Sequence, residues 1–204
     1  MPALIEPASK PTAEYRAWDP RYPDVARSLV TALSPLPRFL SIDHVGSTAI
    51  PGCGGKCVID LLALYEGGFL EETKDLLLAV GFVRQGPGFS HPWPNDRPMY
   101  LGLYRCKGEP FLIYVHVVHR ASDEVRRFCT FKARLLQNPD LIAEYCSCKR
   151  QIIAEGITDT DTYAVRKRAF MHKVLGDDHA LEQATPNQPS EPTATAHRNS
   201  PVFR

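Results

Sequence analysis

Asp60 is the residue of this 204-residue chain whose setting most clearly indicates chemistry. It interrupts the apolar run Cys57–Tyr65, which lies next to a glycine-rich segment and is typical of a strand covered on both faces. A carboxylate in such a strand is costly unless it is paired, hydrogen-bonded or bound to a cation. The alternative is an aspartate satisfied by backbone N–H groups or by a basic neighbour. We expect a functional carboxylate, because perturbed buried carboxylates concentrate at functional sites.

A glycine–serine turn precedes this aspartate along the chain. Gly46, Ser47 and Thr48 follow the predicted strand Phe39–Val45, and Ser47 lies 13 residues before Asp60. Glycine lets a ligand approach the main chain, so backbone N–H groups and a hydroxyl can contact a phosphate there. Gly-Ser turns are common, and the aspartate on the next strand is what makes the pattern specific. Nucleotidyltransferases bring two such elements together around a triphosphate and magnesium.

Two histidines and one lysine could complete a site around Asp60. His116 lies in a third predicted strand, Phe111–Val118, which could run beside the strand of Asp60. With His44 it could hold one metal ion, or it could act as a general base oriented by Asp60. A core histidine bonded to a backbone carbonyl is the alternative. Lys56 could neutralise a phosphate or pair with Asp60, or it could be a solvated loop lysine.

The six cysteines are interpreted as reduced thiols. The N-terminal residues lack the apolar segment of a signal peptide, so we expect a cytoplasmic protein. Zinc binding by Cys53, Cys57, Cys146 and Cys148 is the less favoured alternative, because the last two are two residues apart in a predicted helix and diverge.

Composition argues against several classes of partner. Lys and Arg total 24 against 23 for Asp and Glu, which gives a formal net charge of +1. Nucleic acids and anionic membranes usually require clustered positive charge, and neither is expected. A bilayer span needs roughly 20 apolar residues, and no such run occurs. The sequence carries no signal for an oligomeric state.

The order of elements predicts an α/β or α+β fold, with a mixed sheet in the first 120 residues and a helical second half. We expect one domain over residues 14–177, a flexible arm over 1–13 and a disordered tail over 178–204, which is rich in Pro, Thr, Asn, Gln and Ser. The first expected helix begins at Asp19-Pro20. Four more are expected over Glu71–Val80, Ser122–Gln137, Asp140–Glu155 and Asp159–Leu175. Further short strands are expected at Phe82–Arg84 and Met99–Tyr104.

The string HVGSTAIPGCGGKCVIDLL resembles the signature of the GrpB family. The likeness extends from about residue 14 to 176. It includes Trp18-Asp19-Pro20, the element His116-Val117-Val118, Phe131, Leu135, Pro139, Glu144-Tyr145, Lys149, Tyr163 and Lys167.

This resemblance implies a nucleotidyltransferase-like fold and a magnesium-dependent enzyme that acts on a nucleoside triphosphate and a small-molecule acceptor. It implies nucleotide binding by Gly46, Ser47, Thr48 and Lys56, catalysis or metal binding by Asp60 and His116 with His44, and support from Lys149 and Lys167. One departure matters: Leu62 stands where nucleotidyltransferases carry a second carboxylate. GrpB-like sequences share it, so a non-catalytic nucleotide- or metabolite-binding module is the alternative, and catalytic activity stays open.

Overall fold

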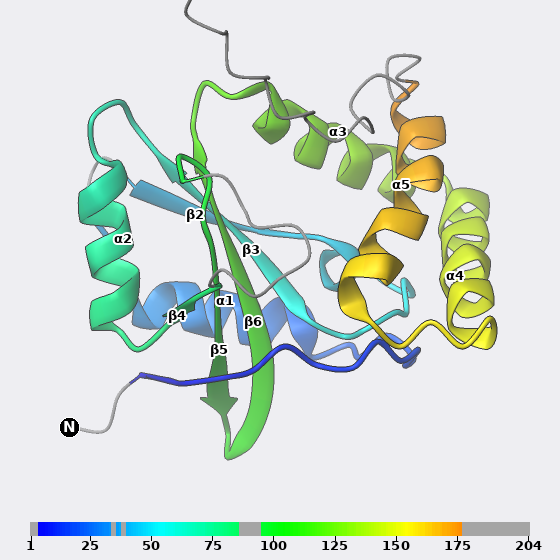
Figure 1. Ribbon diagram of the computed structural model, residues 1–204, viewed down its shortest axis with the longest axis horizontal. Helices are drawn as coiled ribbons and strands as arrows, with labels where there is room; N and C mark the ends of the chain where they lie inside the picture. Colours follow the sequence, from blue (N-terminus) through cyan, green and yellow to red (C-terminus); the bar gives the residue numbers. More distant parts are fainter. Residues whose placement is uncertain (1–3, 34–35, 38–39, 86–94, 177–204) are drawn as a thin grey trace, which may run out of the picture.

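The computed structural model describes residues 4–33, 36–37, 40–85 and 95–176 (Figure 1). The expected disordered tail, 178–204, lies outside these residues. The elements form a mixed α/β structure in which a sheet occupies the centre. Helices α3, α4 and α5 gather on one side of the picture, and α2 lies on the other.

The sheet has the strand order β1-β5-β6-β3-β2, and β4 also pairs with β5. Its strands are β1 (Ile5–Glu6), β2 (Leu40–Val45), β3 (Ile59–Tyr65), β4 (Val83–Arg84), β5 (Met99–Cys106) and β6 (Glu109–His119). Strands β3 and β6 run parallel, and the other pairs run antiparallel. The predicted mixed sheet is confirmed, and the two strands expected to carry Asp60 and His116 are neighbours in it.

Five α-helices surround this sheet: α1 (Tyr22–Ala32), α2 (Leu70–Ala79), α3 (Asp123–Gln137), α4 (Pro139–Ala154) and α5 (Thr160–Leu175). Ser122, Asn138 and Asp159 cap the last three helices by accepting hydrogen bonds from first-turn N–H groups. The first helix begins later than expected. Asp19 accepts a hydrogen bond from the N–H of Arg21 in a preceding turn, and the helix starts at Tyr22.

The expected N-terminal arm is wrong for the described residues from 4 onward. Ile5–Glu6 forms β1 and pairs with β5, and Ile5 is fully buried. Gly102 of β5 makes this possible, because a side chain there would occupy the place of the Ile5 side chain. A two-residue strand leaves too short a pattern to be recognised from sequence.

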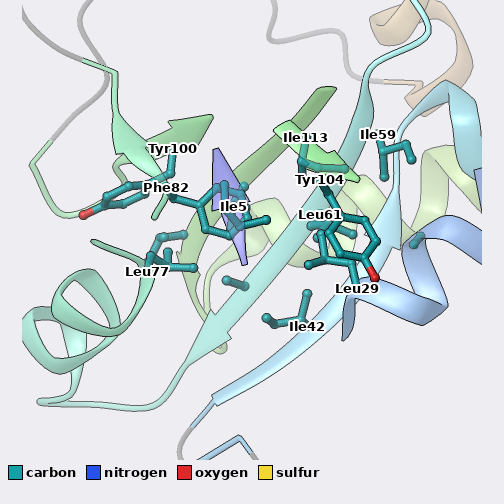
Figure 2. Packing of buried hydrophobic residues seen from close by; sticks show 14 of the residues in the cluster. Ile5, Leu29, Ile42, Ile59, Leu61, Leu77, Phe82, Tyr100, Tyr104 and Ile113 are labelled. Atoms are coloured by element: carbon teal, nitrogen blue, oxygen red, sulfur yellow. The ribbon is translucent and has the colours of Figure 1, made fainter. Parts of the chain in front are cut away.

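The alternation of β3 separates two layers. Ile59 and Leu61 point to the face covered by α1 and α2, where they pack with Ile113, Leu29 and Leu77 in the main apolar core (Figure 2). Leu62 and Leu64 point to the other face, where Val125 and Phe128 of α3 pack on them. Asp60 belongs to this second face, because side chains two residues apart lie on the same side of a strand.

Candidate functional site

Asp60 and His116 meet on the face of the sheet that α3 covers. Asp60 lies opposite Tyr114 in the parallel register of β3 and β6, and His116 lies opposite Leu62. The Nε2 atom of His116 is 3.3 Å from Oδ1 of Asp60. The Asp60 side chain is 25% exposed and that of His116 11%, so the carboxylate can be reached from solvent. The structure therefore brings together the two residues that the sequence singled out on neighbouring strands.

The charge of Asp60 is favoured by its surroundings. Burial alone would raise the pKa of this carboxyl group, but the hydrogen bond with His116 and the nearby ammonium groups of Lys167 and Lys56 outweigh it. The pKa of Asp60 is consequently below its ordinary value, and the group is an anion at neutral pH.

Gly46 lies directly against this carboxylate. Its φ of 71° is in the left-handed region that favours glycine, and a Cβ there would come within 2.9 Å of the Cγ of Asp60. Val45, which precedes it, is the register partner of Asp60 in β2. The turn at Ser47 therefore begins beside the Asp60 carboxylate, as the sequence pattern predicts.

The side chains of Thr48 and His44 form hydrogen bonds inside the protein. The Thr48 hydroxyl donates to the carbonyl of Val58 and lies 3.0 Å from Nε2 of His44, and Thr48 is 1% exposed. The indole N–H of Trp18 donates to the Thr48 carbonyl. The Thr48 side chain is therefore engaged within the protein, and only its main chain could contact a phosphate.

His44 does not join Asp60 and His116, so its predicted role as a metal ligand is wrong. It lies opposite Leu61 in the register of β2 and β3, on the strand side that alternates away from Asp60. Burial, followed by the charge of Lys132, lowers the pKa of His44 to about 4. The ring is neutral at pH 7 and hydrogen-bonded to Thr48.

Lys149 acts beneath the glycine-rich segment. It is 1% exposed, its ammonium group donates to the carbonyl of Gly54 and lies 3.2 Å from the sulfur of Cys53, and it lies 4.0 Å from the centre of the Tyr145 ring. A Cβ on Gly55 would lie 3.3 Å from the Lys149 Nζ and 3.6 Å from the Ser47 Oγ. Lys149 therefore holds the loop that packs against Ser47, and it is too buried to contact a ligand directly.

Lys56 and Lys167 lie close to Asp60, and the pKa of each ammonium group is below the ordinary lysine value. Burial, followed by repulsion from Lys167, lowers the pKa of Lys56 to about 8, while Asp60 opposes this shift. Burial also lowers the pKa of Lys167, again against the attraction of Asp60. These two lysines, unlike Lys149, are only half-buried.

The side chains that the structure describes around Asp60 are too few to hold a metal ion by themselves. Within the described residues, no group of three or more His, Cys, Asp and Glu side chains is placed to hold a metal ion. Leu62, at the position of a second carboxylate, is fully buried under α3. Magnesium is commonly held by one or two carboxylates with phosphate oxygens and water. Asp60 thus supplies a single carboxylate, so a metal ion bound there would need its other ligands from outside the described side chains.

The cysteines do not converge on a zinc site. Cys57, which has a φ of 59°, directs its sulfur toward the carbonyls of Arg16 and Ala17. The sulfur of Cys146 faces the carbonyl of Gly52 instead.

Sequence reasoning gave no role to Tyr114, and it cited Tyr163 only as part of a family likeness. The Nζ atom of Lys56 lies 5.5 Å from the ring centres of both tyrosines, and that of Lys167 lies 5.0 Å from the Tyr163 ring. Tyr114 could have been found, because it precedes His116 by two residues and must share its strand face.

Comparisons with known proteins agree with this architecture. The family model described as "GrpB protein" matches residues 12–177. A UPF0157 protein of Pseudomonas aeruginosa is 28% identical over 165 residues, which are 78% of this chain and 63% of that protein. A UPF0157 protein of Vibrio cholerae is 30% identical over 136 residues, 67% of this chain and 66% of that protein. The chain thus spans slightly under two thirds of the length of these curated relatives.

Solved structures show the same fold. The crystal structure of the conserved protein GrpB from Enterococcus faecalis has a TM-score of 0.62 at 20% identity, and the match covers 80% of this chain and 98% of that one. The GLD-2/RNP-8 complex has a TM-score of 0.50 at 11% identity, covering 76% of this chain and 60% of that one. The fold is therefore similar to that of nucleotidyltransferase-fold proteins.

Another relative has an enzyme name. A dephospho-CoA kinase of Mycolicibacterium paratuberculosis is 29% identical over 173 residues, covering 74% of this chain and 42% of that protein. As to membranes, none of the helices in the described residues has the length and apolar character needed to cross a bilayer.

Proposed function

Because the chain belongs to the GrpB family, we propose that it is a metal-dependent nucleotidyltransferase acting on a small-molecule acceptor. One observation supports this above the others: the ionised Asp60, in contact with His116, lies against the main chain of Gly46 at the start of a glycine–serine turn. A carboxylate beside such a turn is suited to a nucleotide with its metal ion.

The proposed reaction replaces one phosphorus–oxygen bond by another. A hydroxyl of the acceptor attacks the α-phosphorus, the bond to the β-phosphate oxygen breaks, and pyrophosphate leaves. The proton of the acceptor passes to His116, which Asp60 orients. Ser47 and the main chain of Gly46 and Thr48 position the phosphates. A divalent ion held by Asp60 and phosphate oxygens would neutralise charge that develops on them.

A second candidate is a nucleotide- or metabolite-binding module without transfer activity. Leu62 favours it, because this apolar side chain is fully buried where a second metal carboxylate would be needed. The match to 42% of the dephospho-CoA kinase also favours it, since the shared region is one part of that longer protein.

The first test is ligand-dependent stability of an Asp60→Asn variant. We expect nucleoside triphosphate with magnesium to stabilise the wild type, by about 2.7 kcal/mol at 100 times the Kd. Asp60→Asn should lose this stabilisation, measured against its own ligand-free melting temperature. Asp43→Asn is the matched control, because Asp43 is an exposed carboxylate on the neighbouring strand.

Pyrophosphate release separates the two candidates. Wild-type protein that binds nucleotide and releases pyrophosphate when acceptors are supplied is the proposed enzyme, whereas binding without release identifies the module. Ligand-induced stabilisation that survives Asp60→Asn undiminished would remove Asp60 from the site and end both versions of the proposal.

A further inference from the structure

The ammonium groups of Lys56 and Lys167, both near Asp60, contact the same tyrosine ring, that of Tyr163. Lys167 follows Tyr163 by four residues on α5, so both side chains lie on one face of that helix. Lys56 reaches the same Tyr163 ring from the loop before β3, and it also lies over the ring of Tyr114. Residues from the loop, from β6 and from α5 thus meet at one place.

The carboxylates near these lysines are already engaged. Asp60 is in contact with His116, and Asp161 forms an ion pair with Lys10. Among the described residues, no ion pair or hydrogen bond joins the ammonium group of Lys56 or Lys167 to a carboxylate. The two ammonium groups also repel each other, and this repulsion contributes to the lowered pKa of Lys56. Two half-buried cations therefore lack a full complement of negative charge.

The hydroxyl of Tyr114 provides an independent sign of a ligand. Tyr114 is only 6% exposed, and its hydroxyl oxygen is buried without a hydrogen-bond partner in the part of the chain that the structure describes. Burial, followed by the charges of Asp60 and Asp161, raises the pKa of this hydroxyl, so it stays protonated and able to donate. A buried donor of this kind normally has an acceptor.

We propose that Lys56, Lys167 and the Tyr114 hydroxyl bind a phosphate dianion carried by the acceptor substrate. This inference rests on the proposed function and adds a substrate class to it: the acceptor is a phosphate monoester. Two cations and one neutral donor match the charge and the acceptor oxygens of such a group. The Gly46–Ser47 turn on the β2 side of Asp60 is left for the nucleotide.

Inorganic phosphate, without metal, is the probe. Its Kd for the full chain is measured by calorimetry, with chloride replacing phosphate at equal ionic strength as the blank. We expect Lys56→Gln and Lys167→Gln each to weaken binding about 10-fold or more, and Tyr114→Phe to weaken it about fivefold. Lys173→Gln is the matched control on α5, because Lys173 pairs with Glu144, and it should bind as the wild type does.

The ligand-free melting temperatures guard against a folding artefact. Removing a cation that lacks a counter-charge should leave Lys56→Gln and Lys167→Gln as stable as the wild type or more so. Variants that stay folded and bind phosphate as the wild type does would overturn the proposal. So would a wild type that binds phosphate no better than the double Lys56→Gln/Lys167→Gln protein does.

Competition identifies the source of the phosphate. Phosphate that binds equally well in the presence of a saturating non-hydrolysable nucleotide with magnesium occupies an acceptor site, as proposed. Displacement of phosphate by the nucleotide would instead assign the two lysines to the triphosphate and overturn the acceptor assignment. Asp60→Asn keeps the two proposals apart: it should lose the nucleotide response but retain phosphate binding, because it removes a negative charge beside both lysines.

Discussion

The seven residues of β3 alternate between two faces of the sheet, and these faces differ in polarity, charge and exposure. On the face toward α1 and α2, Ile59 and Leu61 are fully buried in an apolar core. On the other face, Asp60 is partly exposed, ionised and surrounded by His116 and lysines. The first face stabilises the fold, and the second carries the charged side chains on which the proposed function rests.

This difference extends across the sheet. The apolar face continues through Ile113 of β6 to Leu77 of α2 (Figure 2). The opposite face, the polar one, has two parts. Leu62 and Leu64 form an apolar part under α3, and Asp60 with Lys167 of α5 forms a charged part. Helix α3 therefore covers one part of this face, and the site lies beside it, where the ring centre of His116 is 5.5 Å from that of Phe128.

The largest expected effect comes from the apolar face. Leu61→Ala removes a fully buried side chain and should lower the free energy of unfolding by about 2–5 kcal/mol, because a cavity adds to the lost burial. Urea unfolding measures this loss. The shift that nucleotide or phosphate produces, relative to the variant's own ligand-free state, should be unchanged. A folded Leu61→Ala protein without ligand response would show that the two faces are not independent.

The next effect concerns the contact between the turn and Asp60. Gly46→Ala would place a Cβ against the Asp60 carboxylate and impose a φ of 71° on alanine, so we expect a loss of about 1–3 kcal/mol. Gly52→Ala is the matched control, because its φ is 76° but nothing lies within 4 Å of the added Cβ.

The difference between these two alanine variants isolates the contact. Shortening Asp60 to glycine in the Gly46→Ala background should recover that difference, as a double-mutant cycle would show. Equal losses for Gly46→Ala and Gly52→Ala would mean that the turn does not press on the carboxylate, and this would remove the contact on which the proposed phosphate-binding turn depends.

Much of this arrangement follows from sequence patterns, but not all of it. The apolar run around Asp60 and the polar His116 in a second strand were enough to predict neighbouring strands with facing side chains. The position of His44 was also readable: it is in phase with Leu40 and Ile42, which are core residues, and so belongs to the opposite face from Asp60. The suggestion that His44 joins Asp60 and His116 at a metal ion did not take this alternation into account.

Other features depend on contacts that sequence does not encode locally. The burial of Ile5 requires the missing side chain of Gly102, almost 100 residues away. Lys149 resembles any helical lysine until the fold places it under Gly54. The charge balance around Lys56 depends on which carboxylates Lys10 and His116 already engage, and this is a property of the assembled structure.

The smallest expected effect is a pH dependence carried by Lys56. Its pKa is about 8 in the folded protein, below the ordinary lysine value that the unfolded chain retains. Between about pH 8 and the unfolded value, the unfolded chain therefore binds more protons, and stability due to Lys56 rises with pH. Below about pH 8 the lysine is charged in both states, and the cost of burying it is present in full.

The charges that act on Lys56 are those of Lys167, Asp60, Lys10 and Asp161, and the other residues that titrate in this range make a matched comparison necessary. We therefore expect the difference in unfolding free energy between wild type and Lys56→Gln to narrow from pH 8 to pH 10, at less than the ~1.4 kcal/mol per pH unit of one full proton. Phosphate binding should weaken over the same range, because it needs the charged amine. A pH-independent difference would mean that Lys56 is solvated like an ordinary surface lysine, and the polar face would then hold only one perturbed cation beside Asp60, that of Lys167.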